Sequence, residues 1–269
     1  MRFPAVSGKF YPADPYELRK MLDSLYRKVP PVPDSGEILG VIAPHAGLIY
    51  SGFSAMHSFR QLEKCSKRKY VMIGPNHTSY RDGTFITSQG DWMTPLGLSS
   101  INNELANSIK SSCEWIIDDE ESNDDEYSLE VELPYLQFIF KNAFSFVPII
   151  MGDQSPVNAG RLARGLAGSG DGYVIIASSD MSHYASQDQV ETNDFEIMSR
   201  IVDLDTQGFY SAIEKESLSI CGAGPIATLM EYTKIRNGKI RILYHSTSAT
   251  VNGDTETAVG YASMVAYRV

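Results

Sequence analysis

The stretch Y-V-I-I-A-S-S-D, residues 173 to 180, decides the expected fold. Its first five residues are all apolar, whereas a strand with one wet face alternates apolar and polar side chains. A short continuous apolar run is typical of a strand buried on both faces, and such strands occur mainly in parallel sheets covered by helices. The stretch therefore predicts an α/β fold.

The rest of the chain alternates short apolar runs with helical patterns. Runs rich in β-branched residues predict strands at 38–43, 70–74, 83–88, 146–151, 173–178, 241–246 and 258–267. Helical spacing predicts helices at 54–63, 101–111, 129–141, 159–166, 192–201 and 225–237. This alternation predicts a single domain over 1–269, with a central, mostly parallel or mixed sheet flanked by helices.

Two segments are predicted to be loops. One is P-P-V-P-D-S-G, residues 30–36, and the other is the acidic run D-D-E-E-S-N-D-D-E, residues 118–126. A block of like charges repels itself and stays hydrated. We therefore expect the acidic run to be solvated.

Composition and sequence patterns limit the kinds of partner that the chain is expected to bind. The chain has 269 residues and a net charge of -10, which disfavours nucleic-acid binding. No segment approaches the roughly 18 apolar residues of a membrane span, and the N-terminus lacks the apolar core of a signal peptide. Three widely spaced cysteines do not indicate a disulfide framework. We expect a cytoplasmic protein with a small-molecule or peptide ligand and no nucleic-acid or membrane partner.

Reactive side chains follow several of the predicted strands. His45 ends G-V-I-A-P-H, Asn76 and His77 end Y-V-M-I-G-P-N-H, and Asp180 and His183 follow the run at 173–178. In open α/β sheets, ligands bind beyond the carboxyl ends of the strands. We therefore expect these side chains to meet at one edge of the sheet.

Cys221 lies in S-I-C-G-A-G-P-I, just before a predicted helix. A helix N-terminus favours the thiolate, although a free cysteine is more often a small buried hydrophobic residue. Two neutral imidazoles and a thiolate can bind a divalent metal with an open position. His45, His77 and Cys221 are thus candidate metal ligands, and Asp180 with His183 is a candidate acid–base pair.

The other histidines and cysteines are predicted to be structural. His57 lies in a helical pattern, His245 lies within a predicted strand, and Cys65 and Cys113 resemble ordinary buried cysteines. The chain has no P-loop, no G-x-G-x-x-G after a strand and no G-x-S-x-G elbow. These absences disfavour nucleotide binding through those motifs and serine hydrolysis.

Together, these segments resemble the Memo family, also called AmmeMemoRadiSam system protein B. The resemblance covers nearly the whole chain. The matching motifs are P-A-V-S-G-K-F-Y-P (4–12), I-A-P-H-A-G (42–47), Y-S-G (50–52), I-G-P-N-H (73–77), T-P-L-G (94–97), S-L-E-V-E-L-P-Y-L (128–136), V-P-I-I-M-G (147–152), S-S-D-M-S-H (178–183), I-C-G-A-G-P-I (220–226) and V-G-Y-A-S (259–263).

The resemblance implies a fold like that of the class III extradiol dioxygenases, which bind non-haem iron. It implies iron or copper, with zinc not excluded, at His45, His77 and Cys221, beside Asp180 and His183. Members are described as a copper-dependent redox protein and as a binder of a phosphotyrosine-bearing peptide. The family name also implies association with radical-SAM system proteins.

The chain departs from the family pattern at one visible position. The family usually has E-H-S before the L-E-V-x-L-P segment, whereas this chain has E-Y-S, with Tyr127 in place of histidine. A phenol does not titrate near neutral pH without a large shift. If position 127 lines the pocket, together with Asn76, the replacement changes proton transfer there.

Two functions remain open from the sequence. One is a metal-dependent redox enzyme or oxygenase of unknown substrate. The other is a non-catalytic module that binds a peptide or an anionic group on a dioxygenase-like scaffold, because fold similarity does not carry activity with it.

Overall fold

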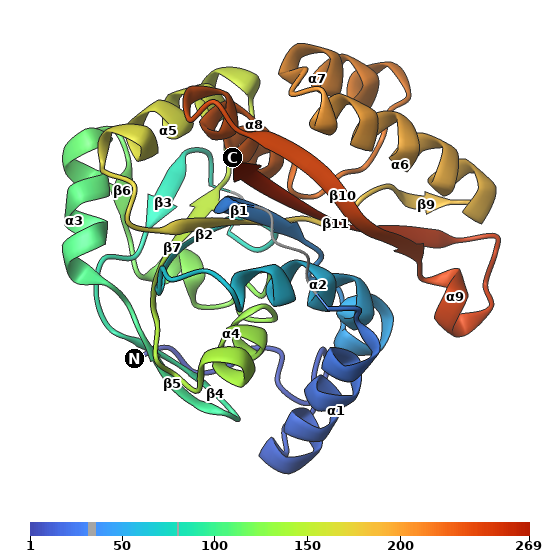
Figure 1. Ribbon diagram of the computed structural model, residues 1–269, viewed down its shortest axis with the longest axis horizontal. Helices are drawn as coiled ribbons and strands as arrows, with labels where there is room; N and C mark the ends of the chain where they lie inside the picture. The colour runs from blue at the N-terminus through green and yellow to red at the C-terminus, as the bar shows by residue number, and fades with distance from the viewer. Residues whose placement is uncertain (32–35, 80) are drawn as a thin grey trace.

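A computed structural model describes residues 1–31, 36–79 and 81–269. The predicted loop at 30–36 lies largely outside the described residues. The central sheet, within the described part, has nine strands (Figure 1). They are β1 (Glu37–Ala43), β2 (Lys69–Pro75), β3 (Thr84–Ile86), β6 (Ile117–Asp118), β7 (Ser145–Met151), β8 (Val174–Ser178), β9 (His183–Ala185), β10 (Lys239–Thr247) and β11 (Ala258–Arg268).

The strand order is β10-β11-β1-β8-β2-β7-β3-β6, with β9 paired to β11. Strands β1, β8, β2 and β7 form a parallel centre. On either side, β11 runs antiparallel to β1 and β3 runs antiparallel to β7. The predicted mixed sheet is confirmed, and its parallel centre places the carboxyl ends of β1, β8 and β2 side by side.

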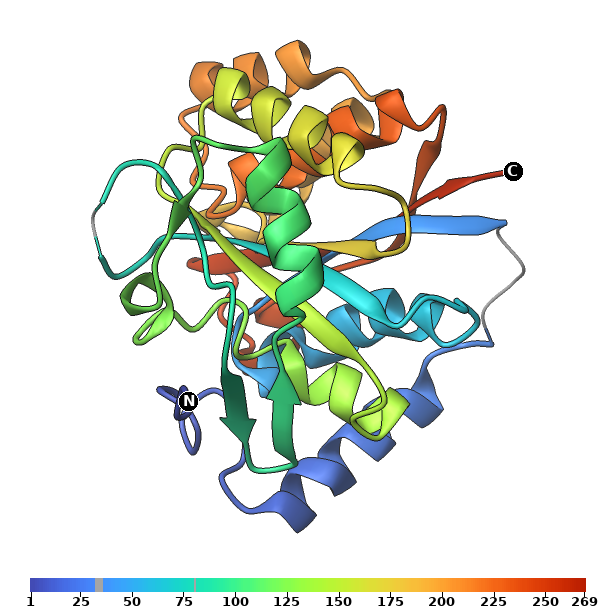
Figure 2. The same ribbon diagram turned by 90° about the vertical axis from the view of Figure 1, so that its left-hand side faces the viewer.

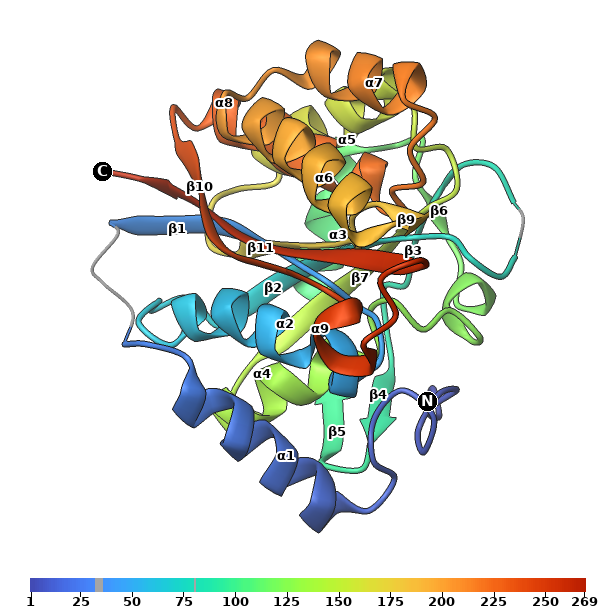
Figure 3. The ribbon, with the colours of Figure 1, turned by 90° about the vertical axis from the view of Figure 1, so that its right-hand side faces the viewer.

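Helices cover both faces of the sheet (Figures 2 and 3). One face carries α3 (Asn103–Ser112), α5 (Pro156–Gly168), α6 (Gln187–Val202), α7 (Thr206–Lys215) and α8 (Ala223–Ile235). The other carries α1 (Pro15–Lys28), α2 (Leu48–Leu62), α4 (Leu133–Phe140) and the hairpin of β4 (Asp91–Thr94) and β5 (Gly97–Ser100). A short helix, α9 (Ala249–Asn252), follows β10. Each face has its own apolar core, which explains why β8 is buried at every position and apolar from Val174 to Ala177.

Each predicted strand and helix is present, with shifted ends. Helix α2 begins at Leu48, six residues before the predicted start. The predicted start was too late because Gly52 lies in the first turns of the helix, where a glycine was not expected. Helix α1 was not predicted, although Asp14 caps it by accepting from the backbone amides of Tyr16 and Glu17. No helix among the described residues combines the length and apolar character that a membrane span requires.

The prediction that the whole acidic run at 118–126 is solvated was wrong. Most of its side chains are exposed or half-buried, but Asn123 and Glu126 are buried. Asn123 donates to the hydroxyl of Thr87, and Glu126 accepts three hydrogen bonds beside the candidate site. Specific partners therefore compensate the desolvation of the Glu126 carboxylate and of the Asn123 amide nitrogen.

The N-terminal arm, residues 2–11, is tied to Glu130. The fully buried Glu130 carboxylate forms an ion pair with Arg2 and accepts from the amides of Ala5 and Val6 and the hydroxyl of Tyr11. Arg2 also donates to the backbone carbonyl of Glu126. The arm therefore supports the segment that carries Glu126.

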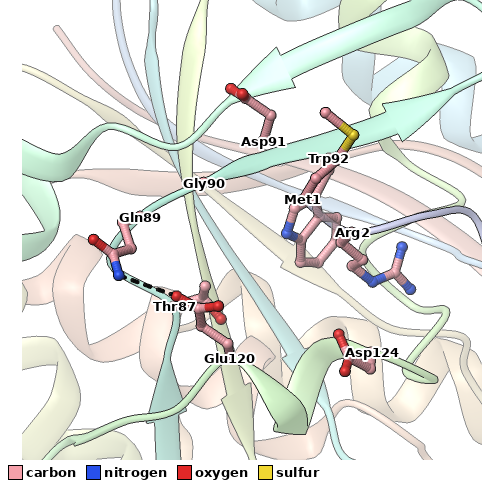
Figure 4. Close-up of a pocket in the computed structure, with 9 residues that line it drawn as sticks. All are labelled: Met1, Arg2, Thr87, Gln89, Gly90, Asp91, Trp92, Glu120 and Asp124. Atoms are coloured by element: carbon pink, nitrogen blue, oxygen red, sulfur yellow. Dashed lines mark hydrogen bonds between the residues drawn. The ribbon is translucent and has the colours of Figure 1, made fainter.

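Arg2 packs on the Trp92 ring, with its guanidinium carbon 4.3 Å from the ring centroid, at a small pocket shown in Figure 4. The pocket has a volume of about 40 Å³, and its rim is acidic, with Asp91, Glu120 and Asp124 among its lining residues. That volume suits about one water molecule. None of its lining residues is a predicted site residue.

Candidate metal centre

Four separate segments bring the predicted site residues to one edge of the sheet. His45 follows β1, His77 follows β2, and Asp180 follows β8. Cys221 lies two residues before α8, with Gly222 as the helix N-cap. A side chain at position 222 would collide with the Ser178 carbonyl, 2.3 Å from its Cβ, so glycine permits the close approach of α8 to β8.

His45, His77 and Cys221 each present one ligand atom, and these atoms lie within 4.8 Å of one another. Cys221 Sγ lies 3.3 Å from His45 Nε2, and the two imidazole rings are 5.2 Å apart at 77°. Ligands bound at about 2.0–2.3 Å in tetrahedral geometry are separated by roughly 3–4 Å. The donor set therefore fits one metal ion.

His45 is buried, and its hydrogen bonds fix its orientation. Its Nδ1 lies 2.8 Å from Ser178 Oγ, while Ser178 Oγ donates to the carbonyl of Ser128 at 3.2 Å. The serine has one proton to donate, so it accepts from His45 Nδ1–H and leaves the Nε2 lone pair facing Cys221. Burial, reinforced by the charge of His77, lowers the pKa of His45 to about 3, which keeps the imidazole neutral.

His77 is oriented by Glu126. Its Nδ1 lies 2.9 Å from one Glu126 oxygen, and its backbone amide donates to the other at 2.6 Å. Burial would raise the pKa of Glu126, but hydrogen bonds from His77 and Ser128 lower it below its usual value. An ionised carboxylate at Nδ1 leaves Nε2 of His77 as the ligand atom, as at many metal sites.

Cys221 is a thiol in the absence of a metal. Burial and the nearby Asp180 raise the pKa of Cys221 well above its usual value, although the Asp180 amide donates to Sγ at 3.2 Å. Burial thus opposes the thiolate that the N-terminus of α8 was predicted to favour. A bound metal ion reverses this balance, since a coordinating thiol is deprotonated.

Asp180 and His183 form, together with Cys221, a second group of donor atoms within 4.8 Å of one another. Asp180 Oδ1 accepts from the amides of His45 and Ala46, which fixes the turn after β1. Burial raises the pKa of Asp180, and the charge of His183 opposes this shift. His183 Nδ1 donates to the Ser219 carbonyl at 2.7 Å, so Nε2 carries the lone pair.

The comparison with known proteins identifies the family. The model of the Memo-like protein family matches residues 2–265. The chain belongs to the Memo family. MEMO1 family proteins of Thermoplasma volcanium and Thermoplasma acidophilum are both 44% identical to it, covering 100% and 98% of this chain and 99% and 98% of their own. One from Methanopyrus kandleri is 35% identical and covers 98% of each chain.

Among solved structures, an uncharacterized protein from Escherichia coli K12 has a TM-score of 0.52. The match covers 83% of this chain and 99% of that one, at 12% identity. This likeness shows the fold alone, and the relation to the class III extradiol dioxygenases stays a prediction.

Tyr127, where this member of the Memo family departs from the expected E-H-S, lines the site. Its ring stacks on His77 at 4.8 Å and 11°, and lies 6.1 Å from His45. Phe10, from the family motif at 4–12, contacts its ring at 4.8 Å. Burial and the charge of Glu126 raise the pKa of Tyr127 to about 12. The phenol is therefore neutral at physiological pH and cannot replace a titrating imidazole.

Asn76 was predicted to line the pocket, but its side chain is engaged in its own loop. It donates to Ser79 Oγ and to the Arg81 carbonyl, and accepts from the Ser79 amide. His57 in α2 stacks on Tyr244 in β10. Neither residue belongs to the Memo family motifs that form the site. His245 is bonded to the buried Asp194 at 2.7 Å.

The sequence analysis missed the residues that orient the ligands. Glu126 was assigned to a solvated run, and Ser178 was treated as the end of a strand. Ser179 was also missed, although its hydroxyl accepts from the Gly222 amide at 2.9 Å and so holds the start of α8. In the sequence, the two serines could have been noticed only because they form the S-S of the S-S-D in a Memo family motif.

Proposed function

We propose that this protein is a metal-dependent redox enzyme whose metal ion, iron or copper, is bound by His45, His77 and Cys221. The observation that carries the proposal is the orientation of both imidazoles. Ser178 occupies Nδ1 of His45 and Glu126 occupies Nδ1 of His77, so the Nε2 atom of each ring is left to bind a metal, and that of His45 lies 3.3 Å from the Cys221 sulfur. Such support of ligand histidines is typical of metal sites.

The donor set favours particular metals. Imidazole and thiolate ligands suit copper, zinc and iron and disfavour magnesium and calcium, which prefer oxygen. An iron or copper ion bound here supplies one-electron redox chemistry. With only His45, His77 and Cys221 as protein ligands, such an ion would still be able to take a further ligand.

We assign proton transfer to His183. Its Nε2 carries the lone pair, because Nδ1 donates to the Ser219 carbonyl, and the ring belongs to the same donor group as Cys221. Asp180 holds the His45 turn through its Oδ1 and places a carboxyl group beside His183. Together they form the acid–base pair of the proposed reaction.

A second function is favoured by Tyr127. The neutral phenol stacked on His77 offers an aromatic face and a hydroxyl group, but no titrating base. The same site can therefore serve as a binding module for a peptide or an anionic ligand without turnover.

The test is elemental analysis of protein purified anaerobically without a metal-affinity tag. We expect about one equivalent of iron or copper per chain in the wild type, and its loss in Cys221→Ser. The matched control is Cys65→Ser, which alters a half-buried cysteine outside the site and should retain the metal. Wild-type protein that is metal-free and also refuses added iron, copper and zinc would overturn the redox proposal in favour of the binding module.

A further inference from the structure

Cys221 belongs to two groups of potential ligand atoms. The first group is the proposed centre of His45, His77 and Cys221, and the second consists of Asp180, His183 and Cys221. In each group the ligand atoms lie within 4.8 Å of one another, and the described residues contain no further group of three. The Cys221 sulfur is thus shared by two potential metal positions.

His183 has one ring nitrogen occupied, as His45 and His77 do. Its Nδ1 lies 2.7 Å from the Ser219 carbonyl, which can only accept, so Nδ1 carries the proton and Nε2 carries the lone pair. The ring is half-buried, and it contacts the Tyr184 ring with centroids 5.4 Å apart. A carbonyl that fixes the tautomer of a histidine is a usual feature of metal ligands.

Asp180 has one carboxyl oxygen engaged and one to spare. Its Oδ1 accepts from the backbone amides of His45 and Ala46. Among the described residues, its Oδ2 takes part in no hydrogen bond. The carboxyl group can therefore hold the turn after β1 and still offer an oxygen ligand. With His183 and Cys221 it completes a set of oxygen, nitrogen and sulfur donors, all of which zinc accepts.

The Cys221 sulfur has the electron pairs that a bridge requires. A coordinating thiol is deprotonated, and a thiolate has three lone pairs. The Asp180 amide donates to one of them at 3.2 Å. The Ser179 hydroxyl, 3.9 Å away, directs its proton to the Asp180 carbonyl. Two lone pairs therefore remain, enough for one ion in each donor group.

We propose that Asp180, His183 and Cys221 bind a second divalent metal ion such as zinc, joined through the Cys221 sulfur to the ion of the proposed centre. This inference rests on the proposed function, because the bridge requires an ion at the first position. Ions in two-metal sites lie about 3.5–4 Å apart, and their repulsion makes the second bind more weakly than the first. The second ion takes the Nε2 lone pair that His183 needs as a base, so excess metal stops its proton transfer.

The first test is titration of metal-free protein with Co²⁺, followed by thiolate-to-cobalt absorption and by electron paramagnetic resonance. We expect two equivalents per chain in the wild type. The resonance should grow over the first equivalent and fall over the second, because two Co²⁺ ions that share a sulfur are magnetically coupled. His183→Asn should keep the first equivalent and lose the second. The control His57→Asn changes a histidine outside both groups and should keep both.

The second test locates the second ion with zinc. Diethyl pyrocarbonate acylates the free nitrogen of an imidazole, and mass spectrometry identifies the modified peptide. We expect His183 to react in protein loaded with one equivalent of Zn²⁺ and to be protected in protein loaded with two. Equal modification of His183 in both samples would overturn the inference.

The outcomes separate the two proposals. If the wild type binds one equivalent of Co²⁺ that Cys221→Ser abolishes, the bridged site fails and the proposed function stands. The same holds if the second equivalent persists in His183→Asn, because the second ion then lies elsewhere. If wild-type protein binds no Co²⁺, iron, copper or zinc, both proposals fail.

Discussion

The His77 imidazole is oriented by the Glu126 carboxylate, which is itself surrounded by hydrogen-bond donors. Glu126 accepts from the His77 ring, the His77 amide and the Ser128 amide, and none of it is exposed. Three donors around a buried carboxylate keep it ionised and immobile. The direction of the His77 lone pair therefore depends on the charge of Glu126, which is not itself one of the candidate metal ligands.

We predict that Glu126→Gln weakens metal binding by about 10- to 100-fold, because a neutral amide accepts less strongly from Nδ1–H and orients the ring less well. Competition titration with a chelating dye would measure the affinity. Glu121→Gln, an exposed change in the same acidic run, serves as the control and should match wild type. Equal affinities for all three proteins would contradict the role of Glu126.

We predict that Tyr127→His adds a titration near neutral pH. The phenol, with its pKa raised to about 12, does not change charge there, whereas an imidazole titrates near pH 6.5 unless it is shifted. The pH profile of Co²⁺ affinity should gain an inflection in Tyr127→His. Tyr127→Phe should retain the wild-type profile, and identical profiles for the two variants would show that position 127 is not coupled to the metal.

At the scale of elements, the site depends on how segments are held against the sheet. The turn after β1 is fixed by Asp180, the start of α8 by Ser179, and the segment before α4 by Arg2 and Glu130. The N-terminal arm is thus part of the support of Glu126, although it contributes no donor atom to the candidate centre.

We predict that Arg2→Leu destabilises the protein by about 3–5 kcal/mol, since it leaves the buried Glu130 carboxylate without its cation. Urea denaturation would measure the loss. The control is Arg27→Leu, which breaks an exposed ion pair with Asp23 and should cost less than about 1 kcal/mol. A similar loss for both variants would contradict the anchoring role of Arg2.

The elements that could be predicted from sequence are those with a strong local pattern. The parallel strands and their reactive ends, His45, His77 and Asp180, follow from continuous apolar runs that stop at polar residues. The roles of Glu126 and Ser178 could not be predicted in this way. Each depends on a neighbour distant in sequence, and a carboxylate in an acidic run has the same local pattern whether it is buried or exposed.

At the scale of the whole molecule, two apolar cores sandwich the sheet, and the ionisable groups between them make stability depend on pH. Burial lowers the pKa of His45 and raises that of Asp180 and of Glu132. The pKa shift of His45 and the pKa shifts of the two carboxyl groups change the stability of the fold in opposite directions as the pH falls. The contribution of His45 is therefore best isolated by comparing the wild type with a variant.

We predict that, without metal, wild-type protein loses stability relative to His45→Gln as the pH falls from about 6.5 toward 3. In that window the unfolded chain protonates His45 and the folded chain does not, so the unfolded state binds more protons and acid favours unfolding. The difference should change by at most about 1.4 kcal/mol per pH unit. Chemical denaturation across this range measures it, and parallel curves for the two proteins would contradict a neutral, buried His45.

The topology also fixes when the proposed centre can be assembled. Cys221 follows His77 by 144 residues, and β11, which pairs with β1, follows Cys221 in turn. At synthesis rates of about 5–20 residues per second, His77 leaves the peptidyl-transferase centre about 7–30 s before Cys221 is added. A nascent chain thus carries both imidazoles long before their sulfur partner, so the complete ligand set can capture an ion only after Cys221 has been added.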